Sequence, residues 1–477
     1  MLSPLRLGNI AAVLLLASLL PAASGNSSGA EHRVASAADI LRITPELHAG
    51  DVLVMVNGEW KGEAVVFNGK GADERPITLR AETPGKVLLS GGSTLTIDGE
   101  HLVVSGLSFG EGQSDRSAIE LRGRQCRLTD TAVTRGNYKF FVHIRGTENR
   151  VDHCYLADKT SVHPTLQVEV EGRPNHHRVD YNFFGPRPPL GRNGGETIRV
   201  GYSHQSMTNS ATLVENNLFE RCDGENEIIS NKSCENIYRF NTFRDCGGMF
   251  TLRHGNRCRV EGNFFLGHGK RGSGGIRVIG EDHVVINNYI EGVEEGGFWI
   301  TSGIPDSPLN GYFQARNCLI AFNTFVESRG PAIELDAGLG RARRTLRPEN
   351  ITIANNLFSV TDSLLLKGRE GANFKWIGNL AAAPGAGTNT TALRIIQPGL
   401  TRGGDGLWRP ATNCPARQAA EGTFAAITND IDGHPRTGRL DVGCDQASDQ
   451  PVLHRPLTAA DVGPSWMKRN GRLTSTK

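Results

Sequence analysis

At residues 237–243 the chain reads Ile237-Tyr238-Arg239-Phe240-Asn241-Thr242-Phe243, and this phrase of apolar residues around an asparagine recurs along the sequence. The shortest steps between its asparagines are 24, 22 and 25 residues, and the longer steps indicate inserted loops. A period of this length that is built from short strands is typical of a parallel β-helix. The asparagine of the phrase falls at Asn182, Asn217, Asn241, Asn263, Asn288, Asn323 and Asn356.

The repeated asparagine supports a stack of coils. Successive coils of a β-helix lie about 4.8 Å apart, which is the spacing of hydrogen-bonded strands. An asparagine at the same turn of every coil can satisfy backbone groups and form a ladder of side chains. An antiparallel sandwich would instead show a period of two, with hairpin turns and no fixed asparagine register. We therefore predict an all-β fold, a parallel β-helix.

The sequence divides into four parts. Residues 1–24 have the basic, apolar and small-residue order of a secretory signal peptide, so we expect export, with a periplasmic or secreted product. Residues 25–35 are expected to form a flexible start. A single β-helix domain is predicted over 36–450, beginning with a short capping helix from Ala37 to Ile43 whose N-cap is Ser36. Residues 451–477 are a C-terminal tail that we expect to wrap or cap the end of the solenoid.

Charge and cysteine content narrow the class of protein. The net charge of the 477 residues is +2, which does not indicate a nucleic-acid partner. No later apolar run reaches the length of a membrane span. The nine cysteines are an odd number, so at least one is unpaired, although export would permit disulfides. Cys222 and Cys246 are 24 residues apart, as are Cys234 and Cys258, which indicates equivalent core positions of the repeat.

Candidate site residues gather around one coil. Glu225 and Glu227 are separated by one residue, so both side chains point the same way on an extended strand. Two such carboxylates and a third ligand can bind a hard cation such as Ca2+. Lys232, Arg253 and Arg277 lie nine, ten and eleven residues before the asparagines of successive coils. We therefore expect the three cations to form a column with rungs about 4.8 Å apart.

A column of like charges is unfavourable unless an anion binds to it. The alternative interpretation is a solvated outer face, on which Lys and Arg are ordinary. A cleft with a carboxylate-bound cation, a lysine and arginines suits a chain of uronic acids, and the chemistry that fits is β-elimination. The cation would stabilise the charge that develops when the C5 proton leaves, and the crowded lysine would accept that proton.

Three motifs carry a resemblance to a known family. Residues 193–199 read NGGETIR, residues 225–233 read ENEIISNKS, and residues 252–255 read LRHG. In this order they resemble polysaccharide lyase family six, which comprises alginate lyases and chondroitinase B. The resemblance covers nearly the whole mature chain and implies a right-handed parallel β-helix.

The resemblance implies a role for each matching residue. It implies that Lys232 is the Brønsted base and Arg253 the acid, although from its chemistry alone an arginine is better suited to charge stabilisation. The implied calcium ligands are Asn193, Glu225 and Glu227, and the implied substrate-binding residues are Arg199, His254 and Arg277. Asn193 is also a typical turn residue, and His254 is also a simple neighbour of the arginine, so the residues alone leave these two roles open.

Two other kinds of β-helix protein share parts of this pattern but fit it less well. A non-catalytic polysaccharide-binding β-helix would share the fold but would not need the lysine. A pectin-type hydrolase would need paired aspartates, and Asp223 and Asp245 do not repeat at equivalent places. We therefore predict a lyase whose partner is an anionic polysaccharide. Alginate is the preferred substrate, dermatan sulfate the alternative, and residues 300–316 and 336–348 are the expected subsite walls. The oligomeric state stays open.

Overall fold

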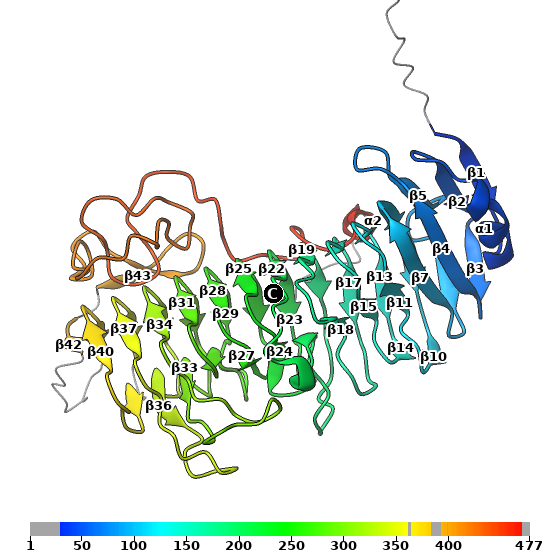
Figure 1. Ribbon diagram of the computed structural model, residues 1–477. Helices are drawn as coiled ribbons and strands as arrows, with labels where there is room; N and C mark the ends of the chain where they lie inside the picture. Colours follow the sequence, from blue (N-terminus) through cyan, green and yellow to red (C-terminus); the bar gives the residue numbers. More distant parts are fainter. Residues whose placement is uncertain (1–28, 361–363, 383–392, 398, 470–477) are drawn as a thin grey trace, which may run out of the picture.

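The computed structural model describes residues 29–360, 364–382, 393–397 and 399–469. The predicted signal peptide, residues 1–24, lies outside these ranges. Three long parallel sheets run side by side through most of the chain, and successive coils stack along one axis (Figure 1). The predicted parallel β-helix is therefore confirmed. No helix within the described residues is long and apolar enough to cross a membrane.

Each complete coil contributes one strand to each sheet, in the chain order A, B, C. Sheet A has 14 strands: β1 (Glu31–Val34), β2 (Val52–Met55), β5 (Ile77–Ala81), β8 (Leu102–Ser105), β12 (Arg127–Thr129), β16 (Arg150–Asp152), β19 (Arg178–Asp180), β22 (Leu213–Glu215), β25 (Ile237–Arg239), β28 (Arg259–Glu261), β31 (Val284–Ile286), β34 (Leu319–Ala321), β37 (Thr352–Ala354) and β40 (Lys375–Ile377). Sheet B also has 14: β3 (Gly58–Lys61), β6 (Val87–Ser90), β9 (Leu107–Phe109), β13 (Ala132–Thr134), β17 (Tyr155–Ala157), β20 (Phe183–Phe184), β23 (Leu218–Glu220), β26 (Thr242–Arg244), β29 (Phe264–Leu266), β32 (Tyr289–Glu291), β35 (Thr324–Val326), β38 (Leu357–Ser359), β41 (Leu380–Ala382) and β42 (Arg394–Ile395).

Sheet C has 12 strands and carries the candidate site. They are β4 (Ala64–Lys70), β7 (Thr94–Glu100), β11 (Ile119–Leu121), β15 (Val142–Ile144), β18 (Leu166–Val168), β21 (Ile198–Gly201), β24 (Glu227–Lys232), β27 (Met249–His254), β30 (Ile276–Val278), β33 (Phe298–Thr301), β36 (Ile333–Ala337) and β39 (Leu366–Lys367). A small parallel pair, β10 (Gly112–Ser114) and β14 (Gly136–Tyr138), lies outside the three sheets. A 3-10 turn, η2 (Ser203–Gln205), follows β21.

The predicted asparagine ladder occupies the short turn between sheets A and B. The side-chain oxygen of Asn241 accepts hydrogen bonds from the backbone N and from Nδ2 of Asn217, both at 3.0 Å. The backbone N and Nδ2 of Asn241 donate in the same way to Oδ1 of Asn263. The same pattern links every neighbouring pair of the seven predicted asparagines and adds Asn379 at the end. Because these side chains are buried, the ladder satisfies backbone groups that water cannot reach.

The residue before each ladder asparagine turns the chain from sheet A to sheet B. Phe240 has a φ of 54° and Asn216 a φ of 53°, and glycine occupies the same place at Gly262, with a φ of 62°. This left-handed conformation closes the turn within one residue. Two residues after the asparagine, an aromatic side chain points into the core. Rings of Phe184, Phe219, Phe243 and Phe265 stack with centroids 4.7, 4.7 and 4.6 Å apart.

The N-terminal cap agrees with the prediction, but the flexible start does not. Helix α1 (Ala37–Ile43) begins after Ser36, whose hydroxyl accepts a hydrogen bond from the Asp39 N–H, and it continues into η1 (Thr44–Glu46). Strand β1 already pairs in parallel with β2, and Val34 is buried. The predicted flexible segment therefore does not extend to residue 35, because its last residues form a rung of sheet A.

The C-terminal part departs from the predicted boundary at residue 450. The coils end at β42, and the chain then forms an antiparallel hairpin, β43 (Leu400–Arg402) and β44 (Trp408–Pro410). The rest, 411–469, does not cap the solenoid end; it packs against the outside of the coils and runs back toward the first ones, ending in α2 (Ser465–Arg469) (Figure 1). Contacts far apart in sequence hold it there, such as the Trp466 indole N–H on the Asp130 carbonyl at 2.8 Å.

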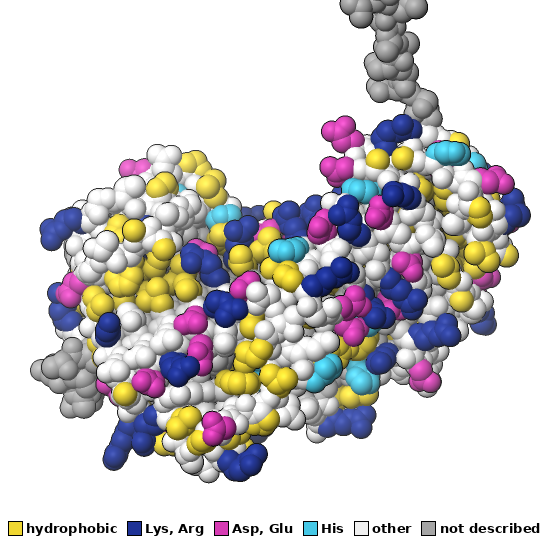
Figure 2. Space-filling view, in the orientation of Figure 1, with side chains coloured by type: hydrophobic (Ala, Val, Ile, Leu, Met, Phe, Trp, Pro, Cys, Tyr) yellow, Lys and Arg dark blue, Asp and Glu magenta, His cyan; other side chains and the backbone are white. Residues whose placement is uncertain are grey.

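The cysteines fill the core as predicted. All nine are buried. Sγ of Cys246 accepts a hydrogen bond from the backbone N of Cys222 on the neighbouring coil, at 3.4 Å, which is the repeat-equivalent relation expected from their spacing. On the face drawn in Figure 2, Lys and Arg side chains are interspersed with Asp and Glu, in keeping with the small net charge. Electrostatic attraction of a charged ligand must therefore come from charges gathered at one site and not from the net charge of the protein.

Candidate active site

The candidate site lies on the outer face of sheet C, at strands β21, β24, β27 and β30. Register places Arg199, Ser230, Thr251 and Arg277 in one row across these strands. Lys232 pairs with His254 in a different row, two residues farther along the strand. The predicted column of three cations is therefore wrong. The number of residues between the basic residue and the ladder asparagine grows by one from each coil to the next, from nine to ten to eleven. These differences place Lys232 and Arg277 two residues apart along the strands.

Arg253 is placed by a β-bulge. Between β24 and β27 the register passes from Asn231 opposite Leu252 to Lys232 opposite His254, so Arg253 is the extra residue on its strand. A bulge leaves its extra residue outside the regular ladder and redirects its side chain. Bulges are common next to active sites for this reason. Arg253 Nε nevertheless lies 4.0 Å from Oε1 of Glu227, which is on the strand of Lys232, although the rows of Arg253 and Lys232 do not match.

Three carboxylates gather at the start of β24. Oxygen atoms of Glu196, Glu225 and Glu227 all lie within 4.8 Å of one another. The sequence predicted Glu225 and Glu227 and missed Glu196, which precedes β21. The signal was present: Glu196 stands two residues before Ile198, Glu227 stands two before Ile229, and these isoleucines pair in register. Oε2 of Glu196 is buried and has no hydrogen-bond partner.

Two glycines shape the carboxylate cluster. Gly194 has a φ of 100°, and a side chain at Gly195 would lie 2.3 Å from the carbonyl oxygen of Gly224. This close approach lets the backbone N–H groups of Gly194 and Gly195 donate to Oε2 of Glu225, at 2.7 and 3.2 Å. Burial, with the charges of Glu196 and Glu227, nevertheless raises the pKa of Glu225 to about 7. The three carboxylates therefore repel one another, and a cation bound between them would relieve this repulsion.

Basic side chains surround the carboxylates without neutralising them by close hydrogen bonds. Lys232 Nζ and Arg199 Nη1 each lie 3.6 Å from Oε1 of Glu196. Arg277 Nη1 and Arg253 Nε lie 3.9 and 4.0 Å from Oε1 of Glu227. The four basic side chains are between 14% and 18% exposed, so they are partly desolvated yet open to the groove. Such an array attracts an anionic ligand.

His254 supports Arg253 and does not face the groove. The residue is fully buried. Burial, followed by the charges of Arg253 and Lys232, lowers the pKa of His254 to about 2, so the ring is neutral. Its Nδ1 faces Arg253 Nη1 at 3.3 Å and its Nε2 faces Ser203 Oγ at 3.2 Å. Because arginine can only donate, Nδ1 accepts and the proton is on Nε2. The predicted substrate contact for His254 is therefore corrected to a positioning role.

An insert after β33 covers Arg253, and the sequence did not predict its central residue. The Tyr312 ring centroid lies 4.1 Å from the Arg253 guanidinium carbon and 4.4 Å from that of Arg344. The carbonyl of Gly311 accepts a hydrogen bond from Arg253 Nη1 at 2.8 Å. The insert reaches back to an earlier coil, where Ser206 Oγ donates to the Leu309 carbonyl at 2.9 Å. The predicted insert 300–316 therefore forms a wall of the site.

The groove extends along sheet C on both sides of Arg277. On one side a cavity of about 740 Å³ is lined by Asn193, Glu225, Glu227, Lys270 and Arg277, among others. Asn193 is exposed at its rim. On the other side Arg277 also lines a second cavity, whose wall includes residues of the predicted insert 336–348, among them Arg341 and Arg344. The site is thus one open trough with several basic side chains, a shape that suits a polymer.

Comparisons with known proteins match this fold and site. The family model described as Chondroitinase B matches residues 34–375. The solved structure described as the PL6 family alginate lyase AlyGC is 33% identical, with a TM-score of 0.77, over 92% of this chain and 59% of that one, so the chain spans less than two thirds of its length. A mannuronic acid specific polysaccharide family 6 lyase from human gut microbiota is 33% identical, with a TM-score of 0.70, over 77% of this chain and 91% of that chain. The PL6 family polysaccharide lyase Pedsa3628 from Pseudopedobacter saltans is 27% identical, with a TM-score of 0.71, over 91% and 99% of the two chains. No match was found among curated proteins.

Proposed function

Because this chain belongs to polysaccharide lyase family 6, the family of chondroitinase B and alginate lyases, we propose that it cleaves alginate by calcium-assisted β-elimination. Membership of the family makes the chain a polysaccharide lyase; the substrate, the cation and the residue roles are our proposal. The observation that carries it is the position of Lys232, whose partly exposed side chain lies beside the carboxylate cluster, with its Nζ 3.6 Å from Oε1 of Glu196. Two relatives at 33% identity are described as acting on alginate or as specific for mannuronic acid, which supports the choice of polymer.

Ca2+ fits the residues at the site. Glu196, Glu225 and Glu227 would hold it, with Asn193 at the rim as a further oxygen ligand, since Ca2+ prefers carboxylate and carbonyl oxygens. Two observations support a cation at this place. Oε2 of Glu196 is buried without a hydrogen-bond partner, and the pKa of Glu225 is raised; a bound cation would interact favourably with both carboxylates. When bound, the cation would neutralise the uronate carboxylate and so favour loss of the C5 proton.

The chain's own residues supply the proton transfers. Lys232 removes the proton from C5, the bond between C4 and its oxygen breaks, and a double bond forms between C4 and C5. Arg253 donates a proton to the departing oxygen. Burial lowers the pKa of Arg253, which brings the guanidinium closer to this role, and the Gly311 carbonyl and the His254 ring orient it. Arg199 and Arg277 bind the carboxylates of neighbouring sugars.

The proposal is tested by the ultraviolet absorbance of the new double bond. Purified protein is mixed in parallel with alginate, dermatan sulfate and polygalacturonate, with and without a calcium chelator. We expect a signal on alginate that Lys232→Ala abolishes and that Lys375→Ala, an exposed lysine on sheet A, leaves intact. A signal on dermatan sulfate alone would show that dermatan sulfate, and not alginate, is the substrate, and it would still support the elimination mechanism. Full turnover by Lys232→Ala would refute the assignment of the base, and full turnover after chelation would refute the role of calcium.

A further inference from the structure

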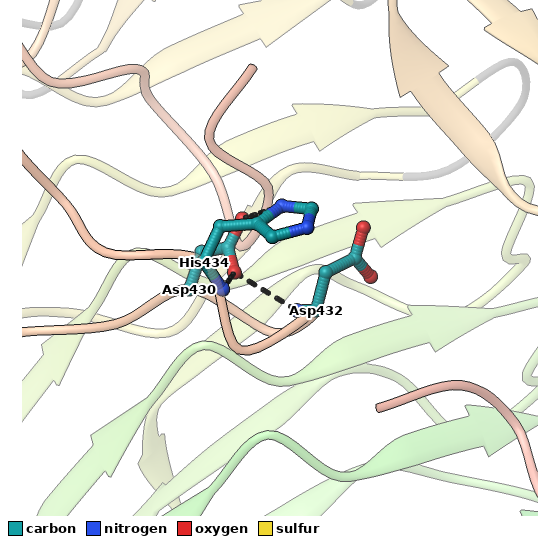
Figure 3. Close-up of side chains that lie close together, drawn as sticks. All are labelled: Asp430, Asp432 and His434. Atoms are coloured by element: carbon teal, nitrogen blue, oxygen red, sulfur yellow. Dashed lines mark hydrogen bonds and ion pairs between the residues drawn. The ribbon is translucent and has the colours of Figure 1, made fainter. Parts of the chain in front are cut away.

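A second cluster of acidic side chains lies in the C-terminal segment, outside the groove (Figure 3). Asp430, Asp432 and His434 are every second residue of one turn, and their exposed fractions are only 3%, 2% and 5%. One ligand atom from each residue lies within 4.8 Å of the others. Figure 3 shows the His434 ring beside the Asp430 carboxylate, with Asp432 on the same turn. None of these residues serves the elimination reaction.

The hydrogen bonds of His434 determine which of its nitrogens is free. Nε2 lies 3.1 Å from the carbonyl oxygen of Pro451, and a carbonyl can only accept, so Nε2 carries a proton. In the neutral ring, Nδ1 then presents a lone pair. This buried Nδ1 has no hydrogen-bond partner and faces Oδ2 of Asp430 at 3.7 Å. A lone pair directed at a carboxylate is unfavourable unless a positive charge lies between them.

The carboxylates of the cluster outnumber the basic groups that reach them. Arg409 pairs with Asp405, Asp432 and Asp445, at 2.6, 2.7 and 3.2 Å. The Asp430 carboxylate has no basic side chain within hydrogen-bonding distance; it accepts from the backbone N–H groups of Asp432, His434 and Gln446. One guanidinium thus serves three carboxylates, while a fourth, that of Asp430, faces the unpartnered Nδ1 of His434.

Neighbouring charges do not remove this imbalance. Arg436 is buried nearby, but its guanidinium donates to Asn287 Oδ1 at 2.9 Å and to the Gly443 carbonyl at 2.7 Å. Each carboxylate oxygen has two lone pairs, so the bonds to Arg409 leave Asp432 with acceptor capacity.

We propose that Asp430, Asp432 and His434 bind a divalent transition-metal ion such as Zn2+. Zinc binds imidazole nitrogen and carboxylate oxygen at about 2.0–2.2 Å in tetrahedral geometry, so two of its ligand atoms lie about 3.3–3.6 Å apart. The Nδ1 of His434 and the Oδ2 of Asp430, which are 3.7 Å apart, are close to this spacing. Calcium prefers ligand sets made only of oxygen, so the imidazole of His434 gives this site a different metal preference from that of the carboxylate cluster on sheet C.

The position of the site indicates what the ion does. The Asp432 carbonyl accepts hydrogen bonds from the backbone N–H groups of Leu453 and His454, at 2.9 and 3.1 Å, and His434 Nε2 donates to the Pro451 carbonyl. The ion would therefore fix the turn 430–434, to which the stretch that leads back along the solenoid is hydrogen-bonded. Binding should stabilise the C-terminal segment against the coils, since an ion that binds only the folded state stabilises it.

Metal content of the full-length protein tests the proposal. Chelator-treated protein is dialysed against Zn2+ or Co2+ in excess Ca2+, which occupies the site on sheet C, and bound metal is counted by mass spectrometry. We expect one equivalent, Co2+ absorption bands in the visible range, and a higher melting temperature with Zn2+. His434→Gln should weaken binding at least about tenfold, because one of three ligands is lost. His454→Gln, in the same segment, and Glu225→Gln, on sheet C, should bind like the wild type.

Two results would overturn the proposal. Wild-type protein that binds neither Zn2+ nor Co2+ would show that Asp430 and His434 share a proton instead of an ion. Equal binding by wild type and His434→Gln would place the metal elsewhere. If His434→Gln does not fold, anomalous scattering from zinc-soaked wild-type crystals decides: a peak between Asp430 and His434 supports the site, and its absence there refutes it.

Discussion

Removing the ring of Tyr312 should slow the reaction through Arg253. In Tyr312→Ala the guanidinium of Arg253 loses an aromatic face whose centroid lies 4.1 Å from its central carbon. A cation above a ring contributes about 0.5–1 kcal/mol when exposed and about 2 kcal/mol when desolvated. Because the Arg253 side chain is only 14% exposed, we take about 1–2 kcal/mol, which corresponds to a decrease of about 5- to 30-fold in kcat/KM.

The matched control is Tyr312→Phe, which keeps the ring and removes only the hydroxyl. Initial rates of double-bond formation on alginate, measured over a range of concentrations, separate kcat from KM. If the ring holds Arg253 for proton donation, Tyr312→Ala lowers mainly kcat, and Tyr312→Phe stays within about threefold of wild type. Two results would refute the reasoning: wild-type rates for Tyr312→Ala, or equal defects in both variants, since the second would assign the effect to the hydroxyl.

Three further predictions follow from the same structure. Asn241→Ala leaves two buried backbone groups without hydrogen-bond partners, so it should lower the free energy of unfolding by about 2–4 kcal/mol in denaturant titrations. The control is Asn256→Ala: Asn256 is partly exposed and its side chain makes a single hydrogen bond, so this variant should lose less than about 1 kcal/mol. Equal losses in the two variants would contradict the role of the ladder. Glu196→Gln should raise the calcium concentration for half-maximal activity by about tenfold or more, because it removes a ligand charge, and an unchanged calcium dependence would exclude Glu196 as a ligand. Burial, with the nearby charge of Arg187, lowers the pKa of Lys159 from 10.5 to about 7, so the unfolded chain binds more protons between these values and stability should rise as pH increases from 7 to 9. Lys159→Met should remove that rise, measured as the shift of the denaturation midpoint, and a parallel shift in both proteins would contradict it.

The architecture of this protein was readable from local sequence because a solenoid repeats one local pattern. Each coil carries the same turn, so the spacing of Asn217, Asn241 and Asn263 predicts both the length of the repeat and the position of the asparagine ladder. The capping helix after Ser36 was predictable for the same reason, since an N-cap and a run of seven residues are local features. The repeat also allowed Glu225, Glu227, Lys232 and Arg253 to be placed on two neighbouring coils, although the column of cations predicted from their spacing was wrong.

Features that depend on register or on long-range contacts were decided only by the tertiary structure. A bulge shifts side chains by one place without changing the hydrophobic period, so the row of Arg253 and the burial of His254 were not visible in the spacing. Glu196 joins the carboxylates only because β21 and β24 pair at Ile198 and Ile229. Tyr312 and the returning C-terminal segment meet the coils through contacts between residues distant in sequence. Local periodicity states which coil a residue belongs to, whereas the free energy of packing between distant segments decides which side chains meet in the groove.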